Sequence, residues 1–446
     1  MTDITRRTAL KTTVGGALAV TAAAAMTRTA LAADPVEIDL FFPVPVQGKL
    51  ADKMKELIER FNGQQQAVKA TAVYTGSYDD TNLKTRAAIK AGKPPGAVIM
   101  SANFVREYVI NGDVDPFDPI IEKDGKSPAE FFDNFWPALK PNAMIDGKVY
   151  GIPYQNSTPL MYYSIDAFKD AGLDPDKPPA TWAEWLDAAK KLTKPGGERW
   201  GVNFPGSYDY CGWLTSAFVM QNGGQYYNHD YGGEVYYSAP SSLGALTMLD
   251  TLVNKAKVMP PGVSDANACT SAFFAGRLGT MLLSTGSLSF VRENMKTPYK
   301  VAFLPKAVRN AAPIGGASLI LPKGNTPERQ AAAWTLISWL ISPETAGEWS
   351  RFTGYFAPRK AAYDLPDMQK FMTEHPDAKI ALDQLKFAVP WFDTFNVVAV
   401  RKAMEDQVQA ILSGKVAPAD AAAAAQKAAD DLLRPYVEQT ALKAIG

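Results

Sequence analysis

Aromatic side chains crowd two loop-like segments of the sequence, and such segments can form a binding surface. Residues 204–213 are rich in Gly, Tyr and Trp, and residues 223–237 hold five Tyr and four Gly. Aromatic clusters of this size are unusual on a surface that contacts nothing. Trp213 would offer a flat apolar platform to the C–H face of a small molecule. For each aromatic residue taken alone, ordinary core packing remains the alternative, because Trp and Tyr are mostly buried in proteins.

Three further groups of residues have types that suit a small-molecule ligand. The segment Trp391 to Phe395 combines aromatic rings with the carboxylate of Asp393, as quaternary-ammonium sites do. The turns at Gly286-Ser287 and Gly315-Gly316 present backbone N–H groups that can bind anions or hydroxyls. Ser157 adds a hydroxyl inside a polar stretch. The alternatives are a solvated loop with buried aromatic anchors for the first group, and a hydroxyl bonded to backbone for Ser157.

A hydrolase is the competing interpretation of these residues. Ser157 or Ser287 could act as a nucleophile, but neither lies in a G-x-S-x-G motif. The two histidines that could serve as bases, His229 and His375, lie in segments expected at the surface. Paired carboxylates of a glycosidase stay possible, since Asp and Glu are plentiful. We therefore predict a protein that is not an enzyme, with a secreted carbohydrate-active or phosphodiester hydrolase as the alternative.

The amino-acid composition limits the classes of partner and metal that the protein is expected to bind. The 446 residues carry 46 basic and 46 acidic side chains and no basic block, so nucleic acid is not an expected partner. Two Cys and two His exclude most zinc and iron–sulfur sites, and no calcium loop of the D-x-D-x-D-G type is present. The sequence predicts no cofactor and no metal. The chain length indicates two or three domains.

The N-terminus reads as an export signal. Arg6 and Arg7 form a twin-arginine pattern, an apolar run of 13 residues follows from Val14 to Met26, and Ala30-Leu31-Ala32 is a cleavage site. The run is shorter than the ~20 residues that span a membrane. We predict a twin-arginine signal peptide over residues 1–32, cleaved near Ala32, and a mature protein in the periplasm. An uncleaved amphipathic tail is the alternative.

Cys211 and Cys269 would meet an oxidising compartment after export. They could form a disulfide, or they could be two small buried residues. The sequence leaves both possibilities open, because it does not give the Cα separation that the bond requires.

Elements in the first hundred residues alternate between strand and helix. Strands are expected at 36–42, 68–74 and 96–100, with helices at 49–61 and 83–91 between them. This order predicts a parallel sheet that binds ligands at the carboxyl ends of its strands. Further along, 150–163 is expected as a polar strand, Thr181 as the N-cap of a helix, and 421–429 as a packed Ala-rich helix.

Motifs spread along the chain resemble a known family. They are Asn156-Ser157-Thr158-Pro159 with Tyr162-Tyr163, the run from Asp166 to Pro175, Thr181-Trp182, Gly286-Ser287-Leu288, Gly315 to Ser318, Glu348-Trp349, and Thr353-Gly354-Tyr355 with Pro358. In this order and spacing the sequence resembles the extracellular solute-binding proteins of bacterial ABC importers, the group that includes maltose-binding protein. Within that family it is most similar to the glycerol-3-phosphate-binding group.

The resemblance implies an α/β, two-lobed periplasmic-binding-protein fold of type II. Each lobe would hold a mainly parallel sheet flanked by helices, and hinge strands would join the lobes. Lobe one would comprise 33–157 and 298–345, and lobe two 158–297 and 346–446. The partners implied are a small hydroxylated solute bound between the lobes and the transmembrane subunits of an ABC permease. The binding protein itself would be a monomer.

The resemblance also implies a set of ligand-binding positions. Matching positions are Tyr78, Ser157, Trp213, Ser287, Gly316 and Tyr355. Four positions depart from the glycerol-3-phosphate pattern: carboxylates fall near Gln47 and near Ala102 or Asn103, Tyr210 replaces a Trp, and Asp393 aligns with the phosphate-binding arginine. That last alignment counts back without gaps from the helix that ends near Gly414. An aspartate in a partly desolvated cleft would repel phosphate by about 1–4 kcal/mol. The expected solute is thus a sugar, a polyol, a cation or a glycerophosphodiester carrying choline.

Overall fold

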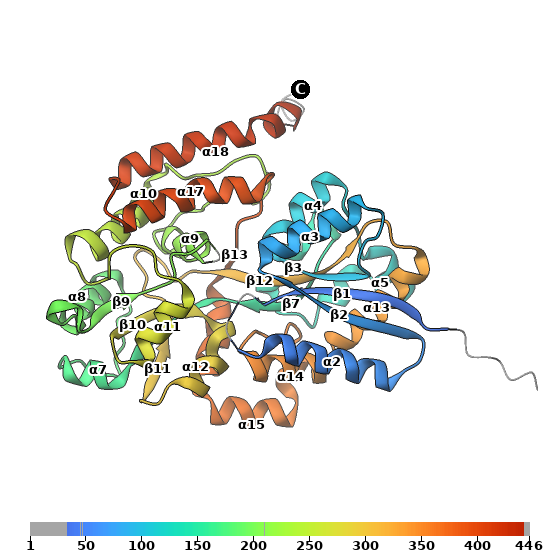
Figure 1. The fold of residues 1–446 in the computed structure, drawn as a ribbon, viewed down its shortest axis with the longest axis horizontal. Helices are drawn as coiled ribbons and strands as arrows, with labels where there is room; N and C mark the ends of the chain where they lie inside the picture. Colours follow the sequence, from blue (N-terminus) through green and yellow to red (C-terminus); the bar gives the residue numbers. More distant parts are fainter. Residues whose placement is uncertain (1–33, 45, 47, 209, 441–446) are drawn as a thin grey trace, which may run out of the picture.

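A computed structural model describes residues 34–440, apart from residues 45, 47 and 209. The predicted signal peptide over 1–32 and the predicted ligand residue Gln47 lie outside the described residues. Figure 1 shows two groups of elements side by side, with β7 and β12 running between them.

The larger sheet contains seven strands within the described residues, in the order β13-β12-β3-β1-β2, with β4 and β7 also paired to β12. Its parallel pairs are β1–β2, β1–β3 and β12–β13, and its antiparallel pairs join β12 to β3, β4 and β7. The bounds are β1 Val36–Pro43, β2 Val68–Gly76, β3 Ala97–Ser101, β4 Val114–Asp115, β7 Ile152–Ser157, β12 Ala312–Pro322 and β13 Ala388–Pro390. The alternation of strand and helix predicted for the first hundred residues is confirmed.

The smaller sheet has the order β11-β8-β10-β9. The bounds are β8 Pro159–Ser164, β9 Trp200–Asn203, β10 Leu278–Ser284 and β11 Tyr299–Ala302. β8 runs antiparallel to β10 and β11, and only β9 and β10 are parallel among these pairs. The α/β class is confirmed, but the sheets are mixed rather than mainly parallel. The reason is that β8 and β12 enter their sheets as connections from the other lobe, against the direction of their neighbours.

Helices cover both sheets, as Figure 1 shows. On the side of the larger sheet lie α2 Leu50–Gln64, α3 Tyr78–Lys90, α4 Val105–Asn111, α5 Asp118–Lys123, α6 Pro128–Phe132, α13 Pro327–Leu340 and α14 Pro343–Thr353. On the side of the smaller sheet lie α7 Ile165–Asp170, α8 Trp182–Leu192, α9 Cys211–Gln221, α10 Pro240–Asp250, α11 Ala266–Phe274, α12 Leu288–Asn294, α17 Val397–Leu412 and α18 Pro418–Thr440. Two further helices, α15 Pro366–Glu374 and α16 Pro376–Asp383, lie in the segment between α14 and β13.

The chain first passes from one sheet to the other at Thr158. The polar strand predicted over 150–163 is two strands, β7 and β8, which lie in different sheets on either side of this residue. Thr158 is held by Thr285, whose Oγ1 accepts from its backbone N–H at 3.3 Å, and by Gln384, whose Nε2 donates to its Oγ1 at 3.0 Å. The crossing coincides with the predicted lobe boundary at 157/158.

Elsewhere the sheets differ from the predicted division into lobes. β11 begins at Tyr299, after the predicted boundary at 298, yet it pairs with β8 in the smaller sheet. The predicted lobe two contains α14 and β13, but Trp349 of α14 belongs to the apolar core of the larger sheet, and β13 pairs with β12. The chain therefore passes between the lobes again after 302, and its C-terminal part contributes to both.

The fold also bears on the two cysteines and on the Ala-rich segment. Cys211 and Cys269 are both buried free thiols, so the structure favours the two-thiol alternative over a disulfide. The Ala-rich segment is part of α18, with Ala421, Ala425 and Ala429 buried, which confirms a packed helix. Within residues 34–440, no helix is long and apolar enough to cross a membrane.

Candidate ligand-binding site

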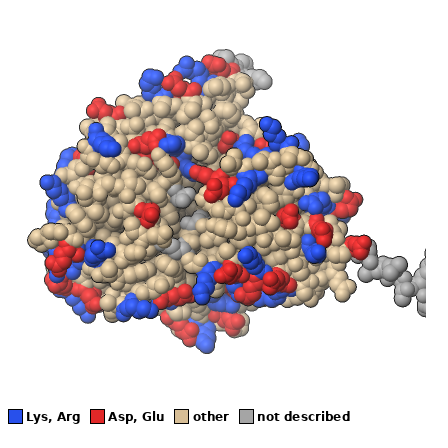
Figure 2. All heavy atoms as spheres, in the orientation of Figure 1, with Lys and Arg blue, Asp and Glu red and all other residues tan. Residues whose placement is uncertain are grey.

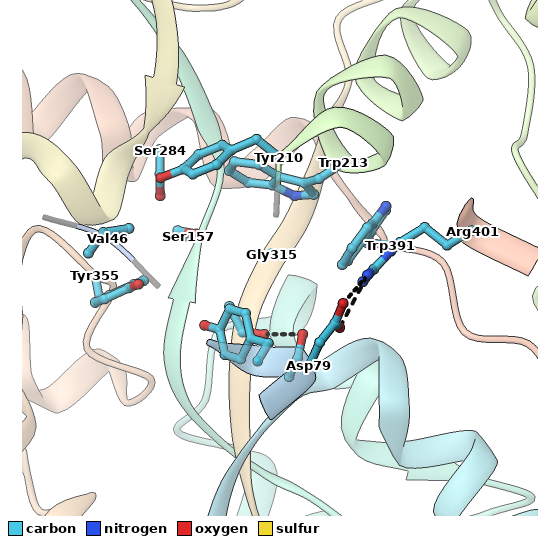
Figure 3. Close-up of a pocket in the computed structure, with 13 residues that line it drawn as sticks. Val46, Asp79, Ser157, Tyr210, Trp213, Ser284, Gly315, Tyr355, Trp391 and Arg401 are labelled. Carbon is cyan, nitrogen blue, oxygen red and sulfur yellow. Dashed lines mark hydrogen bonds and ion pairs between the residues drawn. The ribbon is translucent and has the colours of Figure 1, made fainter. Parts of the chain in front are cut away.

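A small cavity lies between the two sheets, and its wall is built from both (Figure 3). Segments next to the larger sheet and segments next to the smaller sheet each contribute lining residues. The lining residues are Val46, Tyr78, Asp79, Ser101, Ser157, Tyr210, Trp213, Ser284, Gly315, Gly316, Tyr355, Trp391 and Arg401. Five aromatic rings and three serine hydroxyls thus surround one aspartate and one arginine.

The first turn of α3 brings Tyr78 and Asp79 to the cavity. Ser77 caps this helix: its Oγ accepts from the N–H of Asp80 at 3.2 Å, and its own N–H donates to Asp80 Oδ2 at 3.0 Å. This capping box fixes the point at which the helix begins. The phenol of Tyr78 then accepts a hydrogen bond from Gln155 Nε2 at 3.3 Å.

Two glycines let β12 pass close to both lobes at the cavity. Gly316 has φ +88°, and a Cβ there would lie 1.9 Å from the carbonyl oxygen of Gln155. A Cβ on Gly315 would lie 2.6 Å from the indole of Trp213. Trp213, on α9, donates from Nε1 to the carbonyl of Pro313 at 3.3 Å. The indole can approach the backbone of β12 this closely because the side chain there is a hydrogen atom.

The charged pair of the cavity joins the two lobes. Nη2 of Arg401, on α17, lies 2.8 Å from Oδ2 and 3.1 Å from Oδ1 of Asp79, on α3 (Figure 3). The Arg401 side chain is 7% exposed and that of Asp79 is 38% exposed. Because the guanidinium is nearly buried, its interaction with an oxyanion is stronger than at an open surface.

The cavity is narrow in this structure. Its volume is about 40 Å³, whereas pockets that hold small ligands measure roughly 300–1,000 Å³. Room for a ligand of that size would require the two lobes to lie further apart than they do in this structure. Figure 2 shows acidic and basic side chains interspersed over this face of the molecule, without a large area of one sign.

Six of the predicted ligand residues line the cavity together: Tyr78, Ser157, Tyr210, Trp213, Gly316 and Tyr355. Asn103 does not line it but is buried next to it, where its Oδ1 accepts from the hydroxyl of Ser101 at 2.6 Å. Ser287 is fully buried, and Ser284 lines the cavity in its place.

Asp393 lies in another cavity, of about 420 Å³, whose lining includes Arg106, Asn142, Tyr227 and His229. Its Oδ1 is 3.3 Å from Nε of Arg106. Burial raises the pKa of the Asp393 carboxyl to about 6, although Arg106 opposes the shift. The expectation that this residue replaces a cleft arginine does not fit the structure, which places Arg401 in the cleft instead.

Sequence reasoning missed Arg401 because the alignment around Asp393 was counted without gaps. One signal was present in the sequence: Arg401 stands four residues before Glu405, the spacing of an intrahelical ion pair. Asp79 and Ser101 were also missed, although each is next to a residue that the resemblance indicated.

The two histidines lie away from this cavity. His229 and His375 are half-buried rather than at the surface as expected, and each lines a different cavity. Among the described residues that line the cleft cavity, there is no histidine or cysteine that could activate a serine.

Comparison with known proteins now identifies the family. A family model described as bacterial extracellular solute-binding protein matches residues 56–381. The chain belongs to the bacterial extracellular solute-binding proteins. The resemblance expected from the sequence motifs is confirmed, and the function of the chain is solute binding.

Relatives of this solute-binding protein include a curated one in Escherichia coli. The sn-glycerol-3-phosphate-binding periplasmic protein UgpB of that organism is 28% identical over 89% of this chain and 92% of its own length. Among solved structures, UgpB from Mycobacterium tuberculosis in complex with glycerophosphocholine matches with a TM-score of 0.79 and 23% identity, over 91% of this chain and all of the other. The maltose-bound MalE3 protein of T. maritima matches with a TM-score of 0.77 and 22% identity, over 89% of this chain and all of the other. These structural matches confirm the two-lobed fold.

Proposed function

We propose that this solute-binding protein captures a glycerophosphodiester between its lobes and delivers it to an ABC permease. The observation that carries the proposal is Arg401, a nearly buried guanidinium in a cavity walled by aromatic rings and serine hydroxyls. Arginine suits phosphate because its planar donors match the phosphate oxygens. The hydroxyls of Ser101, Ser157 and Ser284 suit the glycerol part of such a solute.

The pairing of Arg401 with Asp79 favours a phosphodiester over a free phosphate. Asp79 offsets the positive charge of Arg401, so a ligand with a single negative charge meets less repulsion than one with two. The Asp79 carboxylate also has aromatic neighbours in the cavity, Tyr78 and Trp391. A carboxylate beside aromatic faces suits a cationic head group such as choline. The relatives that bind glycerol 3-phosphate and glycerophosphocholine are consistent with this class of solute.

Opening and closing of the lobes gives the capture step. The Asp79–Arg401 ion pair connects α3 to α17 across the cavity, and a bound phosphate would take the place of Asp79 on Arg401. The bound ligand then supplies the contacts that hold the lobes together. Closure at the hinge therefore depends on the ligand.

The twin-arginine signal over 1–32 would place the protein in the periplasm with cleavage near Ala32. It would act there as a monomer on the transmembrane subunits of the permease. No chemical conversion is proposed, because the described cavity lining holds no histidine that could serve as the base for its serines.

Isothermal titration calorimetry of the chain beginning at Ala33 tests the proposal. The ligands are glycerophosphocholine, glycerol 3-phosphate, glycerol, ribitol and maltose. We expect the tightest binding for glycerophosphocholine, weaker binding for glycerol 3-phosphate, and the least for glycerol. Tight binding of ribitol or maltose with none for the phosphate compounds would contradict the proposal and assign the site to a neutral polyol or sugar.

A further inference from the structure

A buried glutamate stands directly behind the cavity. Glu405 lies on α17, one turn after Arg401, and is 1% exposed. Its Oε1 accepts a hydrogen bond from the backbone N–H of Gly212 at 3.0 Å, and its Oε2 lies 3.4 Å from Nε of Arg401. This carboxylate therefore contacts both α9 and α17 without lining the cavity itself.

These two contacts hold two walls of the cavity. Arg401 is one wall, and Gly212 immediately precedes Trp213, which is another. A Cβ on Gly212 would lie 2.8 Å from Oε1 of Glu405, so the absence of a side chain at this position lets the carboxylate reach the N-terminus of α9. Movement of Glu405 would disturb the indole and the guanidinium together.

The charge of Glu405 also reaches the cavity. The ionisable groups that face it are Arg401 of α17, Asp79 of α3 and Cys211 of α9, together with the phenols of Tyr226 and Tyr237. Burial raises the pKa of Glu405 to about 7, although Arg401 and the Gly212 N–H favour the charged form. The thiol and both phenols are neutral near this pH, because burial raises their pKa values too. When Glu405 is ionised, two carboxylates face one guanidinium.

We propose that Glu405 is a positioning residue that sets the phosphate selectivity of the cavity. It fixes Arg401 and Trp213 in place, and its negative charge, added to that of Asp79, makes the cavity accept a phosphodiester with one charge and reject a phosphate monoester with two. This inference rests on the function proposed above and extends it to the class of phosphate group that is bound.

The test compares glycerophosphocholine with glycerol 3-phosphate by calorimetry. The proteins are the wild-type chain from Ala33, Glu405→Gln, which removes the charge at nearly constant shape, and Glu405→Asp, which keeps the charge. Glu438→Gln, an exposed site on α18, is the matched control. Circular dichroism checks that each variant is folded. Comparison of variants at one pH cancels the ionisation of the ligand itself.

At about pH 8.5, we expect Glu405→Gln to shift the affinity ratio toward glycerol 3-phosphate on the order of tenfold. Glu405→Asp and Glu438→Gln should keep the ratio of the wild type. At about pH 5.5, where Glu405 is protonated, Glu405→Gln should resemble the wild type.

Four outcomes would overturn the inference. An equal loss of both affinities at both pH values would show that Glu405 is only structural. An equal shift in Glu405→Asp and Glu405→Gln would show that charge is not the cause. Wild-type protein that binds neither phosphate compound would overturn the proposed function and this inference together, whereas normal wild-type binding with an unchanged ratio in Glu405→Gln would overturn the inference alone.

Discussion

At the scale of single residues, the cavity brings together side chains that are far apart in the sequence. Asp79 and Arg401 are joined by an ion pair, although more than three hundred positions separate them. The resemblance to a family located Tyr78 and Trp213, two of the positions that match the binding pattern of that family. It did not locate Arg401, because the count without gaps back from Gly414 selected Asp393 instead. It gave Ser287 for Ser284, because the turn that follows β10 hides which hydroxyl faces the cavity.

Arg401 should contribute most of the phosphate affinity. We expect Arg401→Ala to weaken glycerophosphocholine binding about 10- to 100-fold, because a charge-assisted hydrogen bond is worth about 1.5–3 kcal/mol. Calorimetry measures the effect. Arg434→Ala, at an exposed arginine of α18, serves as the control and should leave the affinity unchanged. Similar affinities in the two variants would exclude Arg401 from the site.

Glu405 should make the stability of the protein depend on pH. Its pKa is about 7 in the folded protein against an ordinary value of 4.5. Between these values the unfolded chain releases a proton that the folded chain retains, so stability falls as pH rises through this window. Glu405→Gln removes the effect. As the pH rises from about 5 to about 8, we expect the free energy of unfolding of the variant to increase relative to that of the wild type by on the order of 2 kcal/mol.

Urea unfolding at both pH values measures this difference, with Glu438→Gln as the reference for an exposed glutamate. A difference between Glu405→Gln and the wild type that stays constant across the pH range would mean that folding does not raise the pKa of Glu405.

At the scale of elements, prediction succeeded where a periodic pattern or a capping motif was present. Thr181 was predicted as the N-cap of α8, and both hydrogen bonds of its capping box with Glu184 are present, at 3.2 and 3.0 Å. Trp213 was expected in a loop but lies in α9, of which every residue is buried. A helix that is buried on all sides has no polar face and so no amphipathic period. The break between β7 and β8 at Thr158 was not predicted for the same reason, because both strands are buried throughout.

The close approach of β12 to β7 should make Gly316 intolerant of a side chain. We expect Gly316→Ala to destabilise the protein by about 2–4 kcal/mol, because its Cβ would meet the backbone of Gln155 and its φ is positive. Gly63→Ala is the control, since nothing lies within 4 Å of a Cβ placed there. In that helical position alanine should be neutral or stabilising by up to about 1 kcal/mol. Thermal unfolding of the two variants gives the comparison, and equal midpoints would contradict the crowding argument.

At the scale of the whole molecule, two sets of polar contacts connect the lobes. One is the Asp79–Arg401 pair. The other is Arg106 of α4, which donates to the carbonyl of His229 at 2.9 Å and pairs with Asp393. The two-lobed architecture could be predicted from the motifs, whereas the closed arrangement and the assignment of α14 and β13 could not, because these depend on contacts between distant segments.

Loss of the Asp79 carboxylate should shift the protein toward an open form. In Asp79→Ala the ligand-free lobes lose the ion pair that spans the cleft, so we expect the radius of gyration to rise by about 1 Å through hinge opening. Small-angle X-ray scattering measures it, with Asp52→Ala at an exposed site of α2 as the control. A radius equal to that of the wild type would show that Asp79 does not hold the closed form.

The most direct test of the account is a crystal structure of the chain from Ala33 with glycerophosphocholine. We predict that the phosphodiester lies between the lobes with its oxygens on the guanidinium of Arg401, in place of the Asp79 carboxylate. A ligand bound instead in the cavity beside Asp393, with the Asp79–Arg401 pair intact, would contradict the account.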